Sequence, residues 1–268
     1  MAGSDSGGGA GIQADLRVFS LLGVWGMSAI TAVTAQNSMG VQHVQLVPPA
    51  VVSMQMDSVL DDIGQDAVKS GMLPSREHVE TVARKLVEYA VKNVVVDPVM
   101  VAKGGAALCD EGARQAFRTS LIPVALVVTP NVPEAEVLSL ITIRTVNDMR
   151  EAAHRIHSLG AQAVLVKGGH LREQSAHDSS ITDVLYDGTQ FTEFSGVRYN
   201  TKNTHGTGCT LSSAIAAYLA KGHGIHDAVA KARRFVEKAV QYSFPLGKGH
   251  GPTNAWAATT RGGERREP

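Results

Sequence analysis

Short apolar runs alternate with amphipathic helical patterns along most of this chain, and this alternation is the feature that most constrains its fold. The apolar runs lie within 27–38, 67–73, 93–100, 124–131 and 163–169. Helices are expected at 12–22, 48–63, 75–90, 110–119, 145–159, 206–220 and 225–243, with a shorter one directly after 131. Apolar strands that alternate with helices predict an α/β protein whose mainly parallel sheet is covered by helices on both faces.

The segment 182–199 departs from this pattern, because its apolar and polar residues alternate on both sides of Asp187-Gly188. Such a pair between alternating segments is a strong hairpin signal, and it is the one clear hairpin in the sequence. We expect it to add antiparallel strands near an edge of the sheet. Neither an internal repeat nor a linker divides the chain. We therefore predict one domain over 1–254 and a polar, disordered tail over 255–268.

Charge and composition exclude several classes of protein. The chain of 268 residues has 25 basic and 25 acidic residues, which argues against a general nucleic-acid or membrane-surface binder. No apolar run approaches the roughly 18 residues of a membrane span, and no signal leader precedes Gly3. Cys109 and Cys209 have no metal-type spacing and favour a reducing compartment. We expect a cytoplasmic protein, or a plastid one if a transit peptide precedes this sequence.

Polar residues follow four of the predicted strands. They are Gln36, Asp97, Asn131 and Lys167. In open α/β sheets, ligands bind outside the carboxyl ends of the strands, so these four residues together indicate a site at that edge.

The stretch NTHGTGCTLSS at 203–213 places two glycines directly before a helix of small residues. The amides of Gly206 to Cys209 would face an anion at the helix start, where the helix dipole favours negative charge. Cys209 would lie in the first turn, a position that lowers the pKa of a thiol. The alternative is a glycine-containing turn before a buried helix, with Cys209 as a small core residue.

Two nucleotide-binding motifs are absent. The chain has no G-x-x-x-x-G-K-[ST] sequence, and its opening glycines do not fit G-x-G-x-x-G because position 12 is Ile. A nucleotide would be held in another way. Asn131 and Glu134 could share a hydrated Mg²⁺, or they could form a capping box at the start of a helix, which their spacing slightly favours.

Seven stretches carry a resemblance to a known family: AGSDSGGGAGIQAD, ITAVTAQNSMGVQ, KSGML, VVVDPVM, TPNVPEAE, VLVKGGH and NTKNTHGTGCTLSSAIAA. They resemble the hydroxymethylpyrimidine/phosphomethylpyrimidine kinases of thiamine biosynthesis, which belong to the ribokinase-like superfamily. The resemblance covers residues 2 to about 254. It implies a three-layer sandwich with a mainly parallel central sheet.

The resemblance also implies an activity: phosphorylation of 4-amino-5-hydroxymethyl-2-methylpyrimidine, and of its monophosphate, with ATP and Mg²⁺. Enzymes of this kind are usually homodimers, and no nucleic acid or membrane is expected as a partner. Two alternatives stay open. One is a pyridoxal kinase-like enzyme, against which Gln36 and Met72 argue; the other is a catalytically inactive pyrimidine-binding protein.

Site residues carry over by resemblance alone. Gly3, Asp15 and Gln36 would contact the pyrimidine, and Met72 would lie near its ring. Asp97, Asn131 and Lys167 would face ATP, and Glu134 would lie on the Mg²⁺ side. Gly206, Gly208 and Cys209 would form the anion hole and supply the base. Among the histidines, His205 is the one within this anion loop.

The glycines from Gly7 to Gly11 are expected to form a substrate loop that approaches the ligand through its backbone. In the family that the chain resembles, the AGSD stretch follows a first β-strand of apolar residues. Here Met1 stands directly before that stretch, so the first strand is expected to be missing and the sheet to have a gap.

Overall fold

The structure is a computed structural model and describes residues 1–102, 104–171 and 180–259. Its main sheet has the strand order β4-β5-β6-β7-β8-β9 among these residues. The strands are β4 (Val68–Ser70), β5 (Val94–Val96), β6 (Val127–Val128), β7 (Ala163–Val166), β8 (Ser180–Tyr186) and β9 (Phe191–Val197). Strands β4 to β7 are parallel, whereas β8 and β9 are antiparallel additions at one end.

Helices cover both faces of this sheet, as the apolar strands predict. One face carries α2 (Pro49–Asp62), α3 (Arg76–Glu88), α4 (Glu111–Ala116), α5 (Val132–Ser139) and α6 (Val146–His157), and the other carries α1 (Gly11–Leu21), α7 (Thr207–Ala220) and α8 (Ile225–Gln241). Strand β5 shows the three layers directly, because Val94 and Val96 pack into one core and Val95 into the other. All three side chains are fully buried.

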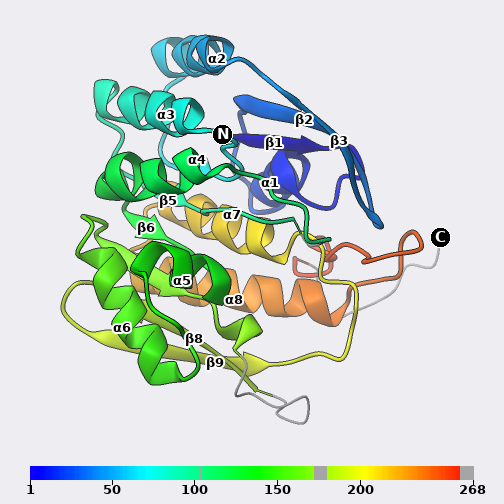
Figure 1. Cartoon of the computed structure of the whole chain (residues 1–268). Helices are drawn as coiled ribbons and strands as arrows, with labels where there is room; N and C mark the ends of the chain where they lie inside the picture. The colour runs from blue at the N-terminus through cyan, green and yellow to red at the C-terminus, as the bar shows by residue number, and fades with distance from the viewer. Residues whose placement is uncertain (103, 172–179, 260–268) are drawn as a thin grey trace.

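A smaller sheet of three strands lies beside the main one: β1 (Ala2–Asp5), β2 (Ile30–Asn37) and β3 (Gly40–Leu46). Figure 1 shows these strands grouped at one side of the molecule, away from β8 and β9. The hairpin β2–β3 corrects the prediction of one clear hairpin. The turn at Ser38-Met39 has neither Asn-Gly nor Asp-Gly, so the sequence offers no strong signal for it.

The gap expected in the sheet lies between β1 and β4, because these two strands belong to separate sheets. The AGSD stretch itself forms the four-residue strand β1, parallel to β2. The ladder bonds between β2 and β3 belong to the small sheet, and β4 begins the large one. The two sheets meet beside Met1 and β2. The amide of Gly71, just after β4, donates to Met1 O at 2.8 Å, and the hydroxyl of Thr31, in β2, donates to Met72 O at 2.7 Å.

Two further segments differ from the expected boundaries. The helix predicted at 110–119 is α4, capped by Asp110, and it continues as a π-helical turn over Phe117–Leu121. Of the predicted disordered tail, residues 255–259 form a turn whose Ala255 packs into the core beside α7 and α8, and 260–268 lie outside the described residues. Within the described part of the chain, no helix is both long and apolar enough to cross a membrane.

Candidate active site

A large cleft lies at the carboxyl ends of the parallel strands, where the polar residues of the sequence led us to expect a site. It is bordered by β1, the ends of β2, β4, β5 and β7, and the start of α7. Ten of the eleven residues predicted for the site line it: Gly3, Gln36, Met72, Asp97, Asn131, Glu134, Lys167, Gly206, Gly208 and Cys209. The sheet topology thus gathers residues that lie up to about two hundred positions apart in the chain.

The glycine loop at one end of the cleft is held by Asp5. One carboxylate oxygen of Asp5 accepts from the amide of Gly7 at 2.8 Å, and the other accepts from Gly9 and Ala10. Nε2 of His205 lies 2.8 Å from that second oxygen. Burial favours the protonated acid, but these hydrogen bonds hold the pKa of Asp5 below its usual value.

The anion loop packs directly against the glycine loop. Gly206 has φ +80°, and a Cβ at this position would lie 1.8 Å from the carbonyl oxygen of Gly9. Only glycine therefore allows the two backbones to approach so closely. Because His205 adjoins Gly206 and bonds to Asp5, the same contact fixes both loops around the end of the cleft.

The start of α7 offers unpaired backbone donors, as expected. Gly206 is its N-cap, and the amide of Thr210 donates back to Gly206 O at 2.8 Å. Among the described hydrogen bonds, the amides of Gly208 and Cys209 donate to no backbone or side-chain oxygen. Free first-turn amides together with the helix dipole form a position suited to an anion.

A lysine stands opposite these amides. Nζ of Lys167 lies 3.1 Å from Oδ1 of Asp97, whose Oδ2 accepts from Ser212 at 3.2 Å. Burial opposes ionisation of both partners, yet their mutual attraction raises the pKa of Lys167 and lowers that of Asp97. A Cβ on Gly208 would lie 3.5 Å from Nζ of Lys167, so the cation is next to the anion loop.

Asn131 and Glu134 form the capping box that their spacing allowed. Oδ1 of Asn131 accepts from the amide of Glu134 at 3.0 Å, and Oε2 of Glu134 accepts from the amide of Asn131 at 2.8 Å. Both residues nevertheless line the cleft. Burial raises the pKa of Glu134 to about 7, although Lys167 opposes the shift. Among the described residues, no group of three or more His, Cys, Asp and Glu side chains could by itself hold a metal.

Cys209 does not have the ionisation that its helix position predicts. Burial raises the pKa of its thiol to about 11, and the nearby carboxylates of Asp15 and Asp97 act in the same direction. Lys69 and the amide of Gly11 oppose the shift and are outweighed. The expected lowering of the pKa by the helix start is therefore wrong for this structure, since desolvation dominates.

Asp15 is the predicted site residue that does not line the cleft. Its carboxylate is buried behind Lys69, which it binds through both oxygens, and its Oδ1 accepts from Ser213 at 2.6 Å. Lys69 instead lines the cleft. A lysine inside the short buried strand VKS was a signal for this role, because a buried lysine needs a partner.

The fold is that of the ribokinase-like small-molecule kinases. A solved structure of Bacillus subtilis pyridoxal kinase with ADP has a TM-score of 0.87 with this chain, at 42% identity, covering 96% of this chain and 95% of that one. The phosphomethylpyrimidine kinase family model matches residues 5–254. The chain belongs to the phosphomethylpyrimidine kinase family.

Two relatives of known name are about half identical in sequence to this chain. The thiamine biosynthesis bifunctional protein ThiED of Geobacter sulfurreducens is 54% identical over 95% of this chain, which spans only 51% of that protein. The hydroxymethylpyrimidine/phosphomethylpyrimidine kinase of Bacillus subtilis is 49% identical over 96% of this chain and 93% of its own length. The chain thus spans about half of the bifunctional relative and nearly all of the kinase.

Proposed function

We propose that this protein is a kinase that transfers phosphoryl groups from ATP to 4-amino-5-hydroxymethyl-2-methylpyrimidine and then to its monophosphate. The observation that carries the proposal is that the free amides of Gly208 and Cys209 lie beside the ammonium of Lys167 in one cleft. Phosphoryl transfer needs positioning and charge stabilisation, and amides at a helix start beside a lysine supply both. The relatives named above support this substrate class.

The pyrimidine would bind at the end of the cleft that holds Gly3, Gln36 and Met72. The side-chain amide of Gln36 offers a donor and an acceptor, which match neighbouring groups on an aminopyrimidine. A Cβ on Gly3 would lie 2.9 Å from the sulfur of Met72, so this wall is closely packed and presents backbone to the ring.

In the transfer, the hydroxymethyl oxygen forms a bond to the γ-phosphorus while the bond from phosphorus to the ADP oxygen breaks. The hydroxyl proton goes to a transferred phosphoryl oxygen, because Cys209 already carries its own proton near neutral pH. Gly206, Gly208 and Cys209 would stabilise the phosphoryl charge through their backbone amides. Lys167, held by Asp97, would neutralise it from the opposite side.

A divalent cation fits the adjoining residues. Glu134 is a buried carboxylate whose pKa is raised to about 7, so a cation beside it would compensate the charge that burial disfavours. Mg²⁺ keeps several waters and takes one or two protein oxygens together with substrate phosphates. Glu134 would hold it with Asn131 nearby, and when bound it supplies further positive charge at the phosphates.

The test is mass spectrometry of the products that the purified chain forms from hydroxymethylpyrimidine, ATP and Mg²⁺. Monophosphate followed by diphosphate is expected, and a Lys167→Met variant of unchanged thermal stability is expected to lose both. No product from the folded chain would overturn the proposal. Pyridoxal is the competing substrate, since a structural neighbour is a pyridoxal kinase; a higher kcat/KM for pyridoxal would favour that activity instead.

We further propose that the enzyme is a cytoplasmic homodimer. Val33 and Leu46, on the small sheet, are apolar side chains that are 49% and 42% exposed, and they support an interface on β2 and β3. Light scattering during size-exclusion chromatography measures the oligomeric state, and a monomer at micromolar concentration would contradict the dimer.

A further inference from the structure

His205 belongs to the anion loop, but its imidazole reaches the glycine loop and pairs there with Asp5. The two side chains are only 12% and 2% exposed, and both residues line the cleft. Burying an ionisable pair costs desolvation energy. The phosphoryl transfer proposed above uses neither side chain, so a different role has to account for this pair at the end of the cleft.

The pair has a fixed direction of hydrogen bonding. Although burial opposes ionisation of Asp5, the bonds from His205 and from the amides of Ala10 and Gly7 hold its pKa below the usual value. Asp5 is therefore a carboxylate at neutral pH, and a carboxylate only accepts hydrogen bonds. Nε2 of His205, 2.8 Å from Oδ2 of Asp5, is the donor. The proton on Nε2 is thus engaged by Asp5.

His205 is held from two sides. Its amide donates to Gly251 O at 3.0 Å, and its carbonyl oxygen accepts from the amide of Thr253 at 3.1 Å, so the segment after α8 anchors its backbone. Its ring lies directly against the glycine loop, because a Cβ on Gly9 would overlap Cδ2 of the imidazole. The glycine loop and the anion loop are therefore connected through this one residue.

The imidazole also contacts the residue expected to bind the pyrimidine. Nε2 of Gln36 lies 3.5 Å from Nε2 of His205, and Oε1 of Gln36 accepts from the hydroxyl of Thr34 at 3.1 Å. The side-chain amide of Gln36 is thus confined between the Thr34 hydroxyl and the imidazole. Both Gln36 and His205 line the cleft.

We propose that His205 is a positioning residue, which ties the glycine loop and Gln36 to Gly206 and so sets the distance between the substrate hydroxyl and the anion loop. This role rests on the kinase function proposed above. His205 acts through the hydrogen bond that it donates to Asp5, and it exchanges no proton with the substrate. A displacement of about 1 Å between reacting groups costs on the order of a hundredfold in rate. Loosening this tie therefore slows transfer.

The experiment compares His205→Leu with His205→Gln. Leucine donates no hydrogen bond, whereas the amide nitrogen of glutamine can reach the place of Nε2 and donate to Asp5. With hydroxymethylpyrimidine, ATP and Mg²⁺, His205→Leu is expected to lower kcat about tenfold or more and to raise KM for the pyrimidine several-fold, with KM for ATP within about twofold. His205→Gln is expected to stay within about threefold of the wild type, because glutamine keeps the bond but transfers no proton.

His226→Leu is the matched control. Nε2 of His226 lies 2.7 Å from Oδ2 of Asp187, so this is a pair of the same kind, and in the described part of the chain neither residue lines the cleft. Its kcat and KM values are expected to stay within about twofold of the wild type. A His205→Gln variant as slow as His205→Leu, with an unchanged Tm, would overturn the proposal and favour proton transfer by the imidazole. So would a wild-type kcat in His205→Leu.

Hydrogen exchange of the free protein tests the tie without any substrate. The amides of Gly7, Gly9 and Ala10 donate to Asp5, so their exchange reports how firmly the glycine loop is held. Their exchange is expected to be about tenfold or more faster in His205→Leu and unchanged in His205→Gln. Unchanged exchange in His205→Leu would overturn the tie. A wild type that forms no product would instead overturn the kinase function, whatever the exchange shows.

Discussion

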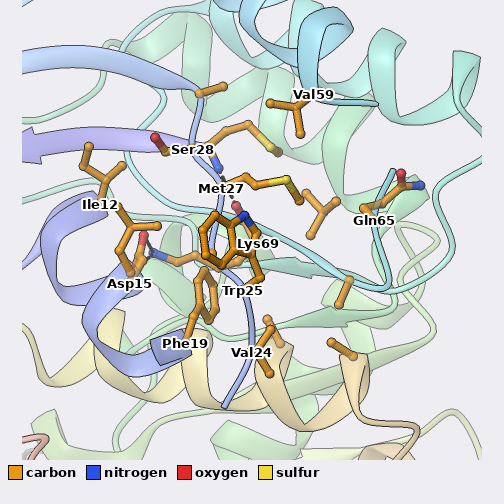
Figure 2. A pocket seen from close by; sticks show the side chains of 18 of the residues that line it. Ile12, Asp15, Phe19, Val24, Trp25, Met27, Ser28, Val59, Gln65 and Lys69 are labelled. Carbon is orange, nitrogen blue, oxygen red and sulfur yellow. Dashed lines mark hydrogen bonds and ion pairs between the residues drawn. The ribbon is translucent and has the colours of Figure 1, made fainter. Parts of the chain in front are cut away.

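Lys69 and Asp15 form a buried ion pair between the active-site cleft and a second cavity, which is lined by residues of α1 and α2 (Figure 2). Nζ of Lys69 lies 2.9 Å and 3.0 Å from the two carboxylate oxygens of Asp15. Their side chains are only 2% and 7% exposed. Lys69 lines both the cleft and this second cavity, whereas Asp15 lines the second cavity and not the cleft.

Removing one partner is expected to cost more stability than removing both charges. Asp15→Asn leaves the ammonium of Lys69 buried without its counter-charge, which costs about 3 kcal/mol or more. The double variant Asp15→Asn/Lys69→Met leaves no buried charge and is expected to recover at least half of that loss. Urea unfolding of the wild type, both single variants and the double variant measures the coupling. Strictly additive losses would show that the two side chains do not depend on each other.

Glu134 is expected to make the protein less stable as the pH rises. Its pKa is about 7 in the folded protein and near 4.5 when unfolded, so the folded state binds the proton more tightly. Between these values the unfolded state holds fewer protons, and the free energy of unfolding falls as pH increases. The contribution is on the order of 1 kcal/mol per pH unit. Denaturant unfolding at pH 5, 6, 7 and 8 measures it.

Glu134→Gln is the matched control for this pH dependence. Glutamine can still accept the amide of Asn131 in the capping box, but it does not titrate. The wild type is therefore expected to lose stability relative to this variant from pH 5 to pH 7. Mg²⁺ with ATP is expected to stabilise the wild type more at pH 8 than at pH 5, because the cation favours the ionised carboxylate. A stability difference independent of pH would contradict the raised pKa.

Cys209 is expected to react slowly with thiol reagents at neutral pH. Its pKa is raised to about 11, so the thiolate that reacts is scarce at pH 7 and increases with pH towards that value. Iodoacetamide labelling followed by peptide mass spectrometry, from pH 7 to pH 10, gives the rate. Burial also raises the pKa of Cys109, and Cys109→Ser removes this second thiol from the measurement. Fast labelling at pH 7 would instead support a thiolate base.

The fold was largely predictable from the sequence, because local patterns determine most of it. Apolar strands that alternate with helices predicted the layers, and the helix predicted at 75–90 is α3, which Ser75 caps. The hairpin β2–β3 was not predictable, since its strands are half-exposed and its turn lacks a strong signal. The short strand β1 was not predictable either, because it depends on pairing with β2 and on the hydrogen bond from Met1 to Lys69, whose partners lie far away in the sequence.

The residues that line the cleft were largely predictable from the sequence, whereas the pKa of the Cys209 thiol was not. Motifs and strand ends brought together Asp97, Lys167 and Gly208, and the structure places them in contact distance. Whether a side chain faces the cleft or lies behind it depends on the packing of several elements, so the sequence did not show that Lys69 lines the cleft and that Asp15 does not. The pKa of Cys209 likewise depends on burial, which the position in a helix does not reveal.

Gly208→Ala is expected to impair phosphoryl transfer without unfolding the protein. The added Cβ would lie 3.5 Å from Nζ of Lys167 and 3.6 Å from Oδ2 of Asp97, which is ordinary contact, and alanine favours the helix. The methyl group would, however, occupy the space between the free amides and Lys167. We expect kcat/KM for ATP to fall about tenfold or more, equivalent to about 1.4 kcal/mol, with Tm unchanged or slightly higher.

Gly224→Ala is the control for this last variant. No atom lies within 4 Å of a Cβ at Gly224, and its φ of −70° suits alanine. It stands before α8, outside the lining of the cleft, so activity is expected to stay within twofold of the wild type. If Gly208→Ala were as active as Gly224→Ala, the phosphoryl group would not pass between the start of α7 and Lys167. The proposed anion position would then be wrong, whatever the substrate.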